Sequence, residues 1–236
     1  MYNIIFYSGY TPAEKFIMCC MFALAAMIAI ICHEFAHGFI ALKNGDDTAK
    51  LAGRLTFNPA KHFDVMGVVL FALVGIGWAN PVPVNPNNFN KPRRGMFTVA
   101  IAGIVTNFIL AVIAFIIFCL LGGIFQAEYV DGSASYYLAF LVYSFLVYTI
   151  VINLCLIAFN ILPIFPLDGF RVVEAFTKPD NKYRVFMYKY GVYILLGLFV
   201  LDIILSNFGY GPLTLYIQFV QNSTLKLFNL VRGLFV

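Results

Sequence analysis

His33, Glu34 and His37 form an H-E-x-x-H motif inside an apolar stretch of the sequence. Residues i and i+4 of a helix share a face, so a helical conformation would turn both imidazoles to the same side. Two imidazoles so placed can hold one zinc ion, and the glutamate between them can act as general base towards a water molecule. Because the chain contains only 3 histidines, this spacing is improbable by chance, and it predicts a zinc site.

A catalytic zinc ion takes a third protein ligand and keeps one position open. Asp168, in the stretch NILPIFPLDGFR, is the best candidate, because Pro163 and Pro166 interrupt the helix there and Gly169 frees the backbone after the carboxylate. His62, in KHFDVMG, is an alternative ligand. It lies in a loop among ordinary surface charges, which favours a solvated or capping role instead.

The composition predicts that these residues are carried by membrane helices. Of the 236 residues, 62% are hydrophobic and only 11% are charged, which excludes a soluble globule, a nucleic-acid-binding protein and a disordered chain. A helix needs about 20 apolar residues to cross the bilayer. Four runs meet this requirement and a fifth is weaker; they cover residues 16–42, 95–125, 136–165, 185–205 and 213–236. The predicted fold is an all-α polytopic membrane protein with four to five transmembrane helices.

The segment between the first two spans has a different pattern. Residues 50–59 carry turn signals at Gly53 and Asn58-Pro59 and predict a short hairpin or edge strand. Residues 65–78 are apolar but short for a span, which favours a re-entrant segment. The fold class therefore includes a re-entrant segment and a small membrane-inserted β element.

Lysine and arginine are concentrated in alternate loops. They occur between the first and second spans and between the third and fourth, whereas the loop between the second and third has Glu128 and Asp131 but no basic residue. Positive loops face the cytoplasm, so the N-terminus is expected outside. The helical rise puts His33 about 27 Å from Lys15 and His37 about 9 Å from Lys43, which places the site within the membrane nearer the cytoplasmic face.

Several stretches resemble the site-2 protease family of intramembrane zinc metalloproteases in order and spacing. They lie within residues 18–175 and read HEFAH, KLAGRLTFNP with KHFDVMG, GWANPVPVNPNNF, AGIVTN and NILPIFPLDGFR. The resemblance is closest to compact members without PDZ or CBS domains. Three positions depart from the family pattern, with Ile104 and Phe165 in place of prolines and Phe170 in place of a glycine.

The resemblance implies roles for six residues. His33, His37 and Asp168 would bind one zinc ion and Glu34 would be the general base. Asn160 and Asn107 would contact the substrate, the alternative being buried amides that bridge helices. Residues 54–57 would form the family's membrane-inserted β element and offer an edge to an unwound substrate.

The function implied by the resemblance is hydrolysis of peptide bonds within or near transmembrane segments of membrane-protein substrates. The expected setting is the lipid bilayer of a prokaryotic plasma membrane, without a nucleic-acid partner. Residues 1–236 would be a single membrane-embedded protease domain, with a core at 16–175 and accessory C-terminal helices at 185–236. Two alternatives stay open, a non-catalytic zinc-binding membrane scaffold and a metal transporter, although no inverted repeat supports transport.

Overall fold

The computed structural model describes residues 9–64, 66–67 and 79–233. Within these ranges the regular elements are helices: α2 (Pro12–Lys43), α3 (Thr48–Leu51), α4 (Pro59–His62), η1 (Pro86–Asn88), α6 (Pro92–Leu120), α7 (Gly122–Phe125), α8 (Ala134–Asn160), α9 (Asp168–Phe176), α10 (Lys182–Ser206) and α11 (Pro212–Gly233). Four of them, α2, α6, α8 and α10, are long and apolar enough to cross a membrane. The weak fifth run forms α11, which is not among these candidate spans.

Helix α2 carries the H-E-x-x-H motif and begins at a strong start signal. The Thr11 side chain caps the amide of Glu14, the Glu14 side chain caps Thr11 in return, and Pro12 occupies the first turn. The helix has 32 residues and is therefore about 48 Å long, more than the ~30 Å of the hydrocarbon layer. The motif lies in its last third, towards Lys43.

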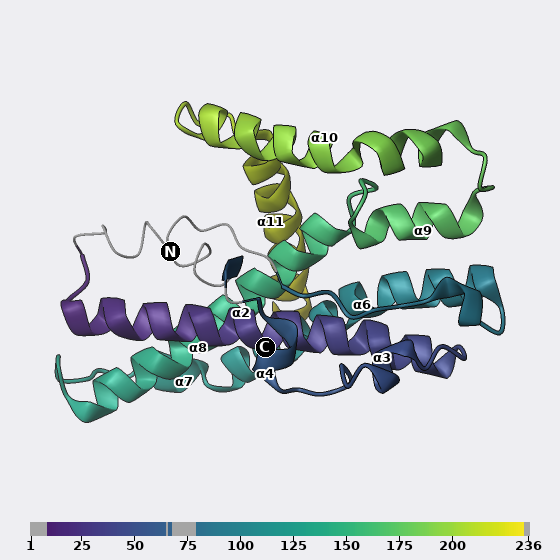
Figure 1. The fold of residues 1–236 in the computed structure, drawn as a ribbon. Coiled ribbons are helices and arrows are strands. Elements are labelled where there is room, and N and C mark those ends of the chain that lie inside the picture. Colours follow the sequence, from purple (N-terminus) through teal and green to yellow (C-terminus); the bar gives the residue numbers. More distant parts are fainter. Residues whose placement is uncertain (1–8, 65, 68–78, 234–236) are drawn as a thin grey trace.

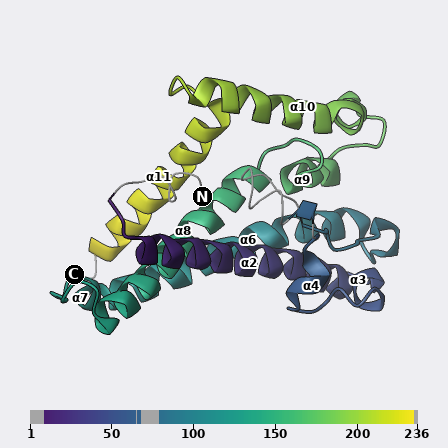
Figure 2. The ribbon, with the colours of Figure 1, turned by 60° about the vertical axis from the view of Figure 1, so that its left-hand side comes forward.

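Helices α2, α6 and α8 pack against one another and form the core, with α9 packed on α6 (Figures 1 and 2). Small residues make this close approach possible, because a lipid environment offers little hydrophobic drive and association depends on backbone proximity. The buried alanines of these helices include Ala25, Ala29, Ala100, Ala111 and Ala158.

Helix α10 lies apart from α2, α6 and α8, and α11 runs from the end of α10 back towards them (Figures 1 and 2). Helix α11 packs on both α8 and α10. The start of α10 is held to α9 by an ion pair in which Arg184 Nη2 lies 2.6 Å from Glu174 Oε1. The Tyr188 hydroxyl donates to the same oxygen at 2.5 Å. Helix α10 therefore steadies the element that begins at Asp168.

A buried carboxylate fixes the loop between the end of α2 and η1. Asp46 is 0% exposed and accepts hydrogen bonds from the amide of Asn85 at 2.7 Å and from Asn88 Nδ2 at 2.9 Å. The amide and the hydroxyl of Thr48 also donate to it. Burial alone would raise the pKa of Asp46. The hydrogen bonds to its carboxylate lower the pKa by more than burial raises it, so the pKa lies below its ordinary value.

The predicted β element at 54–57 is not confirmed. These residues form an irregular connection between α3 and α4 with a bend at 55–56, and the β pairing in the described ranges is one isolated bridge between Phe63 and Ala79. Side chains hold this connection in place: Arg54 Nη2 donates to Asn80 O at 2.5 Å, and the His62 ring bonds Thr56 O. The predicted re-entrant segment at 65–78 lies almost wholly outside the described residues.

Candidate metal centre

The structure brings His33, His37 and Asp168 together, as the sequence predicted. The two Nε2 atoms lie 3.0 Å apart, and Asp168 Oδ2 lies 3.2 Å from each of them. The three side chains are only 9–12% exposed. Three donor atoms from two separate helices, α2 and α9, thus converge on one point inside the protein.

The donor set fits a zinc ion. Tetrahedral zinc with bonds of about 2.0–2.1 Å separates its ligand atoms by about 3.3 Å, close to the distances seen here. Asp168 Oδ2 is buried and has no hydrogen-bond partner in the described part of the chain, so a buried charge is left for a cation to satisfy. Two imidazoles and one carboxylate also leave the fourth position open, as catalytic zinc sites do.

A chain of buried amides orients the ring of His33. Asn153 Nδ2 donates to Thr149 O at 2.7 Å, and Asn153 Oδ1 accepts from Asn107 Nδ2 at 2.7 Å. Asn107 Oδ1 is therefore free to accept from His33 Nδ1, which lies 2.5 Å away. Both asparagines are 0% exposed. The proton is held on Nδ1, and the lone pair of Nε2 is directed at the metal position.

The second histidine is oriented in the same way by backbone. His37 Nδ1 lies 2.7 Å from Val99 O, an acceptor only, so the proton sits on Nδ1 and Nε2 faces the metal position. Val99, Gly103 and Asn107 recur every four residues and form one stripe of α6. Gly103 lies between the two contacts, and a Cβ atom there would fall 2.4–2.6 Å from the His33 ring. The stripe therefore needs a residue without a side chain at its centre.

Asp168 is placed by close backbone packing at the start of α9. A Cβ atom at Gly169 would fall 2.3 Å from Ile161 O, so the turn after α8 closes only with glycine at this position. Phe170 is 0% exposed, and its ring packs against those of Phe165 and Tyr188. The two phenylalanines that depart from the family pattern, Phe165 and Phe170, thus pack against each other at the start of α9.

Glu34 is the remaining polar group of the motif. Its Oε2 accepts a hydrogen bond from the backbone amide of Val82 at 2.8 Å. Val82 belongs to the proline-rich segment that Asp46 anchors through Asn85. The carboxylate is thereby held while its other oxygen, Oε1, has no bond to the described residues, which is suitable for accepting a proton.

The other predicted residues lie differently. His62 is not part of the cluster. It is buried rather than solvated, since it is 0% exposed and its Nε2 bonds the backbone carbonyl of Thr56 at 2.6 Å. Asn107 is buried against His33, which favours the alternative of an amide bridging helices over a substrate contact.

Asn160 ends α8 and bonds Leu156 O at 3.0 Å, and its substrate contact stays a prediction. Asn153 was missed, although an amide in an apolar span is itself a signal.

Two histidines and an aspartate that could hold a metal ion, with a glutamate next to the first histidine on a candidate spanning helix, match the residue types of a metallohydrolase site. The model of peptidase family M50 matches residues 21–198. The chain belongs to this family, and it is a multi-pass membrane zinc metalloprotease.

Individual relatives agree with the family assignment. The chain is 37% identical over 212 residues to YwhC of Bacillus subtilis (strain 168), a protein whose name describes it as a zinc metalloprotease. The match covers 88% of this chain and 90% of YwhC. It is 29% identical over 161 residues to Rip2 of Mycolicibacterium smegmatis, assigned by name in the same way, covering 66% of this chain and 57% of Rip2. No solved structure gives a significant match.

Proposed function

We propose that the protein is an intramembrane endopeptidase that cuts membrane-protein substrates within or near their transmembrane segments. The observation that carries the proposal is the triangle of His33 Nε2, His37 Nε2 and Asp168 Oδ2, built on candidate spanning helix α2 and closed by α9. We assign these three residues as the zinc ligands and Glu34 as the general base. We assign the whole chain to a single protease domain, with a core at 16–175 and accessory helices at 185–236.

Each residue has a distinct task in this reaction. The zinc ion, when bound, polarises the scissile carbonyl and lowers the pKa of a water molecule. Glu34 Oε1 takes the proton from that water and delivers it to the nitrogen of the leaving amine, while the Val82 amide holds Oε2 in place. Asn107 and Val99 O keep both imidazoles in the tautomer whose Nε2 lone pairs face inward.

The substrate must expose its peptide bond before it is cut. A transmembrane helix hides its carbonyls in intrahelical hydrogen bonds, so the substrate must unwind locally, which helix-weak residues ease. Asn160 lies at the end of α8, eight residues before Asp168 along the chain, and is the candidate contact for the unwound backbone.

We also propose a setting and an orientation. The basic residues Lys43, Lys91, Arg93 and Arg94 belong to the end of α2 that follows the H-E-x-x-H motif and to the start of α6, which the Asn44–Thr98 hydrogen bond joins. Positive loops face the cytoplasm, so this end would be cytoplasmic and the N-terminus outside in a prokaryotic plasma membrane.

The test compares membrane-protein fragments in cells that carry wild type, Glu34→Gln or Glu128→Gln. Glu128 is an exposed carboxylate far from the motif in the sequence, and its variant is the matched control. Peptides that end inside apolar spans are expected with wild type and Glu128→Gln and absent with Glu34→Gln. Zinc content, measured on each purified protein, should be equal in all three.

Other outcomes would reject the proposal. Fragments that persist in Glu34→Gln would remove Glu34 from its role. Identical profiles for all variants with zinc retained would favour the non-catalytic scaffold. Zinc flux into liposomes that needs the two histidines would favour a transporter; in the described ranges, however, a single cluster of metal-binding residues is found.

A further inference from the structure

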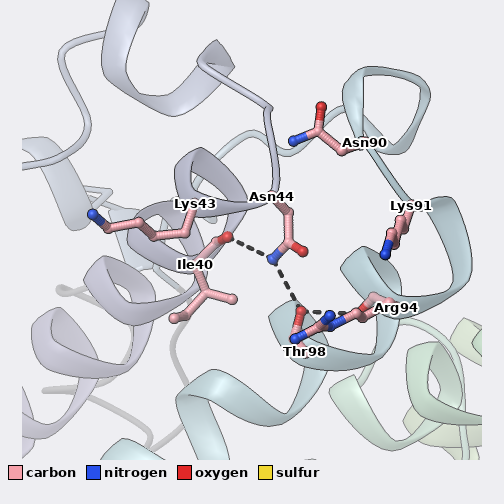
Figure 3. A pocket seen from close by; sticks show the side chains of 7 residues that line it. All are labelled: Ile40, Lys43, Asn44, Asn90, Lys91, Arg94 and Thr98. Carbon is pink, nitrogen blue, oxygen red and sulfur yellow. Dashed lines mark hydrogen bonds between the residues drawn. The ribbon is translucent and has the colours of Figure 1, made fainter.

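A cavity of about 380 Å³, lined mainly by residues with polar or charged side chains, lies where the end of α2 meets the start of α6 (Figure 3). Asn44 Nδ2 donates to Ile40 O at 2.8 Å and to Thr98 Oγ1 at 3.0 Å, which joins the two helices beneath the cavity. The amide of Asn90 donates to Asn44 O at 2.8 Å and joins them again at the rim. The walls are therefore fixed by hydrogen bonds between elements distant in the sequence.

The charge of this cavity has one sign. Lys91 and Arg94 stand on the α6 side, and Lys43 is on the α2 side, with its ammonium 5.4 Å from the centroid of the Phe39 ring (Figure 3). None of the described residues that line the cavity is acidic. Neither Lys91 nor Arg94 forms an ion pair with any residue that the structure describes. Two exposed cations without a carboxylate partner are suited to an anionic group with several oxygen atoms.

An apolar groove of about 350 Å³ continues from the same place along α2 and α6. It shares Ile40 and Thr98 with the polar cavity, so the two hollows adjoin. Ala36, Phe39 and Val105 are among its lining residues. Phe39 and Val105 are 41% and 47% exposed, which means that the groove opens on the outer face of the helix pair. In a membrane that face is covered by acyl chains.

We propose that the cavity and the groove together bind one anionic phospholipid. The phosphate would be held by Lys91 and Arg94 at the end of the spanning helices, and one acyl chain would lie along Phe39 and Val105. Basic pockets between transmembrane helices are a recurrent site for acidic headgroups. A basic cavity and an apolar groove that share Ile40 and Thr98 match this ligand class better than a free anion, which would have no use for the groove.

This site is separate from the metal centre in its chemistry but linked to it in structure. Thr98, in the cavity, precedes Val99, whose carbonyl orients His37. A bound lipid would brace the α2–α6 junction that holds the histidines. The proposal needs only the membrane location of the protein, so its failure would leave the proposed protease function untouched.

The experiment is native mass spectrometry of the full chain in detergent with phosphatidylglycerol or phosphatidylcholine of identical acyl chains. Wild type is expected to retain one phosphatidylglycerol and to lose phosphatidylcholine. In Lys91→Gln/Arg94→Gln, affinity for phosphatidylglycerol should fall about 30-fold, at about 1 kcal/mol for each charge. The charge-matched control is Lys61→Gln/Arg93→Gln, two exposed positions that do not line the cavity. Its binding should match wild type.

Two further arms distinguish a lipid from a free phosphate. Val105→Trp fills the groove from an exposed position and keeps both cations, so it should weaken lipid binding. Inorganic phosphate, which carries no acyl chain, should fail to displace phosphatidylglycerol at millimolar concentration. Equal retention of both lipids, or equal losses in the two double variants, would overturn the proposal. Displacement by phosphate would show an anion site without lipid selectivity and would overturn it as well.

Discussion

Replacing Asn107 by leucine tests whether this residue positions His33 or contacts the substrate. The two side chains have nearly the same shape, so the change removes the hydrogen bonds and leaves the packing. Asn107 Oδ1 is the acceptor for His33 Nδ1, 2.5 Å away. In Asn107→Leu the imidazole N–H would be left unpaired at a position that water does not reach, since Asn107 is 0% exposed.

Two independent magnitudes predict the size of the effect. A buried donor left without a partner costs about 1–3 kcal/mol. Loss of the group that orients a metal-bound histidine lowers metal affinity about 10- to 100-fold, which is about 1.4–2.8 kcal/mol. The second range predicts a zinc affinity about 10- to 100-fold weaker than wild type, and the first, which converts to about 5- to 160-fold, encloses it. Asn153→Leu should cost less, because Asn107 Oδ1 can still accept from His33 when the Asn153 bond is lost.

The assay is a competitive zinc titration of the purified protein against a chelator, followed by cleavage kinetics at saturating zinc. Asn160→Leu is the control, because Asn160 bonds only Leu156 O among the described residues and should leave zinc affinity unchanged. Thermal unfolding checks that each variant is folded. If Asn107→Leu bound zinc like wild type and raised only KM for the substrate, the positioning role would be refuted, and the predicted substrate contact would hold.

Two further predictions concern packing and acid stability. Gly103→Ala should lower zinc occupancy and thermal stability, because its Cβ atom would fall 2.4–2.6 Å from the His33 ring, whereas Gly197→Ala, in open space, should leave both unchanged. The lowered pKa of Asp46 means that its stabilisation is complete above the ordinary value of 3.8 and is lost as the pH falls further. Asp46→Asn should abolish this acid-dependent loss in unfolding experiments, and an unchanged pH profile would refute the assignment.

Much of the candidate site could be predicted because its chemistry is local in the sequence. The spacing of His33 and His37 determines that they share a helix face, whatever the rest of the fold does. Asp168 stood out through the proline and glycine residues around it, and the structure indeed breaks α8 there and begins α9. The four long apolar runs became four long helices, since apolar length alone dictates a span.

What could not be predicted depends on contacts between distant segments. The residues at 54–57 have a strand-like pattern, but the Arg54 side chain bonds Asn80 O and the Thr56 carbonyl bonds the His62 ring, and no neighbouring strand pairs with them in the described ranges. The hydrogen-bond partners of Asn107 could not be predicted from the sequence either, because its bonds to His33 and Asn153 join three helices. A buried amide and a substrate-binding amide look identical in one sequence.

The matching periods of two helices explain why the centre forms at this junction. His33 and His37 are four residues apart on α2, and Val99, Gly103 and Asn107 recur every four residues on α6. The higher-numbered histidine contacts Val99 and the lower-numbered one contacts Asn107, so the helices run antiparallel with their stripes in register. The Nδ1–H of each imidazole thereby donates to an acceptor on α6, and each Nε2 faces Asp168. A shift of one helix by a single turn would separate both donor–acceptor pairs at once. The packing that assembles the bundle therefore also determines which ring nitrogen of each histidine carries the proton.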